Sequence, residues 1–169
     1  MRTAAAAGLL PLGLLACGGP WLRYEPSAAW LLTAAGDELA YTQVYVDPIP
    51  YRALGSPPVE VKVYLVLENE TETPLHLHKE SLALVDWRQS PLELARIDPG
   101  RGTEAGSAPP RTRSSFTLVF ATPPATRPEP AALAGFVFRW GVEQKDAVVA
   151  GRVDIDRDWG YGDGDGSCR

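Results

Sequence analysis

The chain has few of the residues that build metal centres and cross-links. Its 169 residues include two cysteines, two histidines and one methionine. The methionine is Met1, which belongs to an N-terminal signal described below, so a soft copper site is not expected. The cysteines are Cys17 and Cys168, at opposite ends of the chain. We therefore expect a core held together by packing, without a disulfide between its layers.

Excess positive charge is also missing. Sixteen Lys and Arg residues face twenty-one Asp and Glu residues, for a net charge of −5. Proteins that bind nucleic acid concentrate Lys and Arg against the phosphates, so no nucleic-acid partner is expected. The sequence also lacks a G-x-S-x-G elbow and a phosphate-binding glycine loop. Without a catalytic constellation, the protein is predicted not to be an enzyme and to need no cofactor.

No apolar run beyond the N-terminal stretch is long enough to span a bilayer. Arg2 is followed by an apolar stretch from Ala4 to Ala16, which has secretory length and is too short to span a bilayer. The stretch ends Leu14-Leu15-Ala16-Cys17, which resembles the lipobox of bacterial lipoproteins. The alternative is an ordinary secretory signal that leaves Cys17 in the mature protein.

The lipobox resemblance has consequences for location. It implies cleavage before Cys17, lipidation of Cys17 and attachment to a membrane of the cell envelope. In a host with two membranes, Gly18 resembles the residues that permit transfer to the outer membrane. Several acyl chains hold a protein far more firmly than one chain, whose binding is marginal.

The clearest pattern beyond the signal is the alternating stretch Val59 to Asn69. Every second residue from Val59 to Leu67 is apolar, and the residues between them are mostly polar. Because side chains alternate across a strand, this pattern predicts a strand with one apolar face. Such a face has to be covered by a second sheet.

Further strands are predicted on both sides of this stretch. Ala28 to Val46 is predicted to form a hairpin around Gly36-Asp37, with a helix after Ser27 as the alternative. Residues Leu92 to Ile97 favour a strand over a short capped helix. The remaining strands are expected at Leu75–Lys79, Ser81–Trp87, Arg113–Ala121, Phe136–Glu143 and Val148–Ile155.

These elements predict an all-β protein with an antiparallel sandwich of seven or eight strands. The expected core includes the Val59–Leu67 face, Phe116, Phe120, Phe138 and Trp140. The expected organisation is a signal peptide over residues 1–16, a tether over 17–27, the sandwich over 28–157 and a flexible tail over 158–169.

From Val59 to Asp156 the order of motifs resembles the immunoglobulin-like domains of bacterial lipoproteins grouped as domains of unknown function. The motifs are an Asn-containing turn after a long strand, a Leu-x-Leu-x-Asp strand, and a Phe-x-Leu-x-Phe-x-x-Pro strand. They stand here at Leu67–Thr71, Leu82–Asp86 and Phe116–Pro123. The resemblance implies a non-catalytic binding or scaffolding module whose partner is another envelope protein.

One competing function rests on His76-Leu77-His78. In a strand, these two imidazoles would face the same way, about 7 Å apart at Cα, which suits one metal ion. A metal site needs three or four ligands, so Glu70, Glu72 or Glu80 would have to contribute an oxygen. The alternative is a solvated polar side of a strand.

Overall fold

The computed structural model describes residues 21–100, 106–125, 127–145 and 147–158. Within these ranges the chain forms twelve strands and two short 3₁₀ helices. The strands are β1 (Trp21–Leu22), β2 (Ser27–Leu32), β3 (Glu38–Val46), β4 (Ile49–Pro50), β5 (Glu60–Asn69), β6 (Leu75–Leu77), β7 (Ala83–Asp86), β8 (Pro91–Pro99), β9 (Ser107–Ala108), β10 (Arg113–Ala121), β11 (Gly135–Gln144) and β12 (Ala147–Asp156); the helices are η1 (Tyr51–Gly55) and η2 (Lys79–Ser81).

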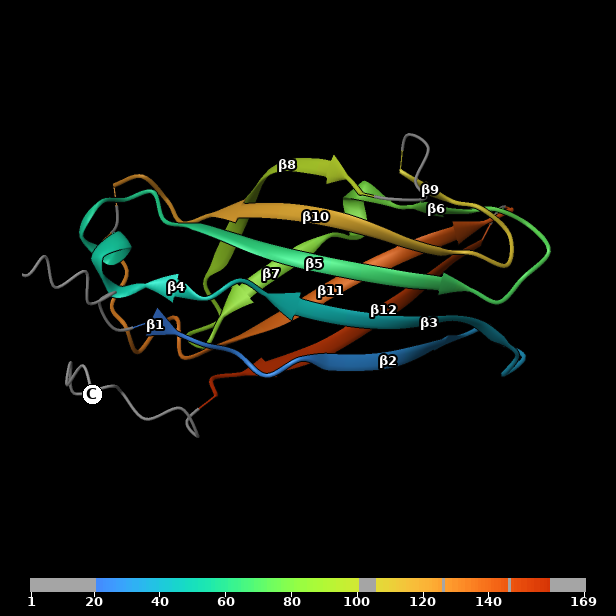
Figure 1. Ribbon diagram of the computed structural model, residues 1–169, viewed down its shortest axis with the longest axis horizontal. Coiled ribbons are helices and arrows are strands. Elements are labelled where there is room, and N and C mark those ends of the chain that lie inside the picture. The colour runs from blue at the N-terminus through green and yellow to red at the C-terminus, as the bar shows by residue number, and fades with distance from the viewer. Residues whose placement is uncertain (1–20, 101–105, 126, 146, 159–169) are drawn as a thin grey trace, which may run out of the picture.

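The strands pack as two facing antiparallel sheets (Figure 1). The first sheet has the order β2-β3-β5-β10-β8. In the second, β11 lies between β12 on one side and β6 and β7 on the other. Strand β8 pairs with β7 at its start and with β10 further along, so it passes from one sheet to the other. The predicted all-β sandwich is confirmed.

The strand order is that of a constant-type immunoglobulin domain. Such domains carry strands A, B, E and D in one sheet and C, F and G in the other. If β3, β5, β7, β8, β10, β11 and β12 are labelled A to G in chain order, the two sheets have this order. Strand β2 adds one further strand beside β3.

Strand β5 is the centre of the first sheet, with β3 and β10 on either side. The alternation predicted for it is confirmed, since Val61, Val63 and Leu65 are all fully buried while Glu60 and Glu68 are exposed. The predicted Arg113–Ala121 strand is β10, and it pairs with β5 along its whole length. Because the apolar residues of both strands point toward the second sheet, β5 and β10 together form one continuous apolar layer.

Large aromatic side chains fill the space between the sheets. Phe138 and Trp140 come from β11, and their rings stack with centroids 5.2 Å apart. Phe120 of β10 meets Phe138 edge to face at 6.2 Å. These residues and Phe116 have at most 1% of their surface exposed, so the predicted aromatic core is confirmed.

The two ambiguous stretches are both strands. Residues 28–46 form the hairpin β2-β3, and Gly36 in its turn has a φ of +89° that favours glycine. The alternative helix after Ser27 is not formed. Residues 92–97 lie within β8, as the favoured interpretation predicted.

Two local predictions need correction. The strand expected over Leu75–Lys79 ends at Leu77, because the chain turns into η2. The strand expected over Ser81–Trp87 is the shorter β7, from Ala83 to Asp86, because η2 occupies its start. The structure also contains β4, η1 and β9, for which no strand or helix was predicted, because elements of two to five residues are too short to produce a periodic pattern.

The segment assigned to a tether packs on the sandwich from Trp21 onward. Leu22 is fully buried, and the Tyr24 ring lies 5.2 Å from that of Phe136. The Glu25 amide donates a hydrogen bond to the carbonyl of Asp156 in β12. The signal peptide, Cys17 and the tail after Asp158 lie outside the described residues.

Candidate binding surfaces

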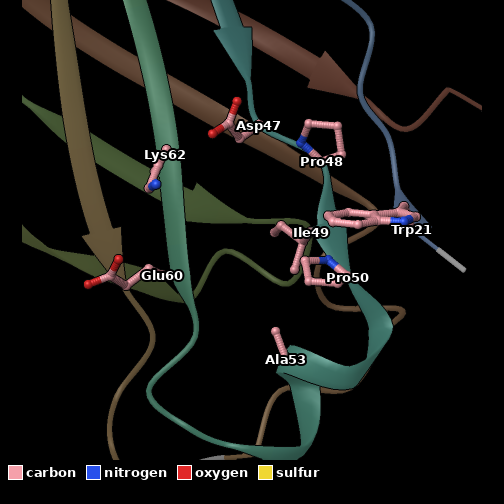
Figure 2. Close-up of a pocket in the computed structure, with 8 residues that line it drawn as sticks. All are labelled: Trp21, Asp47, Pro48, Ile49, Pro50, Ala53, Glu60 and Lys62. Carbon is pink, nitrogen blue, oxygen red and sulfur yellow. The ribbon is translucent and has the colours of Figure 1, made fainter. Parts of the chain in front are cut away.

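A cleft of about 290 Å³ lies where the chain enters the sandwich (Figure 2). One side of it is apolar and includes the Trp21 indole, and the other side carries charged groups. The lining residues are Trp21, Asp47, Pro48, Ile49, Pro50, Ala53, Glu60 and Lys62.

Strand pairing holds Trp21 at this cleft. Strand β1 pairs with β4, with Trp21 opposite Pro50 and Leu22 opposite Ile49. Leu22 and Ile49 are buried in the core, at 0% and 3% exposure. Because successive residues of a strand point to opposite sides, burial of Leu22 directs Trp21 outward, where 42% of its surface is exposed. Figure 2 shows the indole beside Ile49 and Pro50.

The charged side of the cleft belongs to the end of the first sheet. Asp47 follows β3 and accepts a hydrogen bond from the Tyr64 hydroxyl at 2.9 Å. This hydrogen bond raises the pKa of Tyr64 above its ordinary value. Glu60 pairs with Arg96 of β8 at 3.3 Å. Figure 2 places Lys62 and Glu60 across the cleft from Trp21, so the cleft is amphipathic.

A second surface is the outward face of the first sheet, which is rich in aromatic side chains. Trp30 of β2 stands opposite Tyr41 of β3, with ring centroids 5.0 Å apart. Four residues further along β3, Tyr45 stands opposite Tyr64 of β5. Trp30 is 47% exposed, and the three tyrosines are half-buried. We call Trp30, Tyr41, Tyr45 and Tyr64 the aromatic face.

The aromatic face also contains a hydrogen-bonded polar side chain, that of Gln43. Gln43 lies between Tyr41 and Tyr45 on β3, and its Oε1 accepts from the Tyr45 hydroxyl at 3.0 Å and from Arg113 at 2.8 Å. Interface cores in protein complexes are enriched in tyrosine, tryptophan and arginine and depleted in lysine and glutamate. The aromatic face shares the tyrosine, tryptophan and arginine content of such interfaces, and the charged residues Glu68 and Lys62 of β5 lie at its margins.

The two histidines considered together in the sequence analysis stand at the end of β6. His76 lies in β6 and is exposed. His78 stands just beyond the last residue of β6 in an extended conformation, with φ −84° and ψ 104°, and its backbone N–H donates to the Gly141 carbonyl of β11. A metal site at this pair therefore stays a prediction. Among the residues that the structure describes, no group of three His, Cys, Asp or Glu residues is placed to hold a metal ion.

His78 instead contacts two side chains of the following 3₁₀ turn. Its Nδ1 lies 2.7 Å from Ser81 Oγ, and its Nε2 lies 3.5 Å from Glu80. A serine, a histidine and a carboxylate also make up a hydrolase triad, in which a buried acid fixes the imidazole. Here the Glu80 side chain is 80% exposed, so it does not fix the ring. The contacts are those expected of a local turn.

No protein-family model matches the chain, and no curated protein is similar to it in sequence. The lipoprotein and domain-family resemblances therefore stay predictions. Neither short helix in the described ranges has the length and apolar character to cross a bilayer.

Tyr24, which follows β1, has a partly buried hydroxyl. The Tyr24 hydroxyl donates to the Leu133 carbonyl at 2.9 Å. Burial raises the pKa of Tyr24 well above its ordinary value of 10.0, and the charge of Arg157 opposes this shift only in part. In the unfolded chain the hydroxyl loses its proton near pH 10, whereas in the folded protein it keeps it. The folded state then binds the extra proton, so stability falls as pH rises above 10.

Replacing Tyr24 by phenylalanine is expected to cost about 1 kcal/mol at neutral pH, through the lost hydrogen bond. The same change is expected to flatten the decline of stability above pH 10. Urea unfolding of both proteins across pH 7 to 11 measures both effects. Parallel pH profiles for the two proteins would show that Tyr24 does not carry the alkaline sensitivity.

Proposed function

We propose that this protein is a non-catalytic binding or scaffolding module of the cell envelope, anchored to a membrane through lipid on Cys17. The observation that carries the binding role is the aromatic face. It presents aromatic side chains with hydroxyl and amide groups between them on one side of the sheet. Rings of this kind supply large contact area at a low cost in conformational entropy. The partner we infer is another envelope protein.

The location rests on the lipobox before Cys17 and on the path of the chain after it. Only Gly18, Gly19 and Pro20 separate Cys17 from Trp21, the first residue of β1. A lipid on Cys17 would therefore hold the whole sandwich close to the membrane. Loops at the far end and the sheet faces would stay accessible to a partner.

The anchor is tested by metabolic labelling with a fatty-acid probe. We expect the wild type to carry label and to sediment with membranes, and Cys17→Ala to lose both properties. A wild type without label would be a freely secreted protein. It would also make Cys17 available for a disulfide with Cys168, and the proposed location would be wrong.

The binding role is tested by placing a photoreactive benzoylphenylalanine in the anchored protein. At Ala28, exposed on β2 and opposite Gln43, it is expected to form a discrete cross-linked product with one partner. The matched control is Ala150, which is exposed on the outer face of β12 in the other sheet. Adding Trp30→Ala and Tyr41→Ala is expected to abolish the product. Equal products from Ala28 and Ala150 would contradict binding through the aromatic face.

A further inference from the structure

We propose that the Trp21 indole rests in the lipid surface, so that the end of the sandwich carrying β1 and β4 faces the membrane. The inference depends on the proposed lipid anchor at Cys17, and it adds an orientation and a protein–lipid contact. The contact surface consists of Trp21, Pro48, Pro50 and Ala53, which form the apolar side of the cleft in Figure 2.

The length of the connecting chain limits where Trp21 can be. Trp21 is four residues after Cys17. Four residues span at most about 14 Å when fully extended. The polar headgroup layer of one leaflet is about 5–7 Å thick. Because the acyl chains on Cys17 lie in the hydrocarbon, Trp21 has to stay at or near the headgroup layer.

The fold prevents Trp21 from turning back into the protein. Leu22 is completely buried and is paired with Ile49, which is 3% exposed. Turning the indole inward would bring Leu22 to the surface, at a cost of about 1.5–3 kcal/mol for its apolar side chain. The indole is therefore presented outward at the point where the anchored chain arrives.

The chemistry of the surface suits a lipid interface. An indole has a large apolar body and one N–H donor, and such side chains concentrate where one end is apolar and the other is wet. The residues beside the indole have uncharged, apolar side chains. They are Pro48, Pro50 and Ala53. On the polar side of the cleft, the Lys62 ammonium group can attract a lipid phosphate. The two carboxylates on that side already have protein partners, Asp47 with Tyr64 and Glu60 with Arg96.

Trp30 is the matched control for Trp21, because both indoles are exposed but they lie on different surfaces. Trp30 is exposed to a similar degree, 47% against 42%, but it lies on the aromatic face and packs on Tyr41. If Trp21 faces the lipid while the aromatic face stays free for a partner, Trp21 contacts the bilayer and Trp30 does not. If the protein instead lies flat on the aromatic face, Trp30 contacts it. Trp87 is more exposed, at 65%, but it is present in all the proteins compared, so it does not account for a difference between them.

The experiment measures tryptophan fluorescence in the lipidated full-length protein. Wild type, Trp21→Phe and Trp30→Phe are reconstituted into vesicles of phosphatidylethanolamine and phosphatidylglycerol whose acyl chains carry bromine close to the headgroup. Bromine quenches only indoles that reach the bilayer. We expect Trp21→Phe to keep about half or less of the wild-type quenching, because its interfacial indole is gone. Trp30→Phe is expected to keep nearly all of it.

Two results would overturn the proposal. Unchanged quenching in Trp21→Phe means that this indole is outside the bilayer, and loss of quenching in Trp30→Phe means that another face meets the lipid. Vesicle flotation separates these results from failure of the anchor. Protein that floats with the vesicles but shows no Trp21-dependent quenching disproves only the orientation. Wild type that carries no lipid and does not float disproves the anchor, and the orientation with it.

Discussion

Replacing Trp140 by alanine is expected to lower the free energy of unfolding by about 3–5 kcal/mol, as for other buried tryptophans. The Trp140 side chain has no exposed surface, and it stacks on Phe138 in the centre of the sandwich. Its ring also fills the space above Gly151 of β12, where an added Cβ would lie 2.4 Å from the indole. The described part of the chain contains no cysteine, so no disulfide there limits the loss.

The matched variant is Trp140→Phe. The indole N–H has no hydrogen-bond partner, and phenylalanine removes this buried polar group while keeping one ring in the core. We expect it to cost about 1–2 kcal/mol, since the smaller ring leaves a smaller cavity. Denaturant unfolding of both variants tests the difference. If alanine is tolerated as well as phenylalanine, the sandwich does not depend on this stack.

Replacing Asn69 by alanine is expected to cost about 3 kcal/mol, because several buried polar groups lose their partner at once. Asn69 ends β5 with only 1% of its surface exposed. Its Nδ2 lies 2.8 to 3.1 Å from the carbonyls of Thr73, Ala108 and Pro109, and its two hydrogens are shared among these three acceptors. Its Oδ1 accepts from the amide and the hydroxyl of Thr71. One side chain thus joins the β5–β6 turn to β9.

The variant Asn69→Asp tests the donated hydrogen bonds separately from the accepted ones. Aspartate keeps the acceptor for Thr71 but places a carboxylate oxygen against three carbonyls. It is therefore expected to destabilise at least as much as alanine. Glu68→Ala is the control, because Glu68 is the preceding residue and is exposed. Thermal unfolding of the three variants tests this. Near-wild-type stability of Asn69→Asp would show that the hydrogen bonds donated by the Asn69 amide contribute little.

Much of the fold was predictable because strand burial is a local pattern. In β5 and β10, every second residue from Val59 and from Ser114 is buried, and this period of two is readable without knowing the partner strands. The aromatic core followed from the same rule, because Phe136, Phe138 and Trp140 share one face of β11. Strand order is different, since it depends on contacts between residues far apart in the chain.

The short elements were missed for a related reason. His76-Leu77-His78 alternates as a strand would, yet β6 ends at Leu77. The His78 amide still pairs with Gly141 of β11, and the 3₁₀ turn η2 that begins at Lys79 ends the extended run. A stretch of three residues has too little pattern to distinguish these outcomes.

The candidate surfaces were visible only in part. The apolar N-terminal stretch and the lipobox-like motif at Cys17 can be read directly from the sequence because they are short linear patterns, and the lipid anchor that they predict stays a prediction. The aromatic face needed the register, since only pairing between β3 and β5 brings Tyr45 opposite Tyr64. Trp21 and Leu22 are adjacent and both apolar, and the sequence does not distinguish them.

The sequence by itself therefore determined that this is an all-β domain with a packed aromatic core, because alternation and side-chain volume are properties of each strand alone. The tertiary structure decided which strands pair, which outward side chains form a surface, and which of Trp21 and Leu22 is exposed. These outcomes depend on long-range pairing. The pairing of β1 with β4 buries Leu22 against Ile49 and leaves Trp21 at the surface.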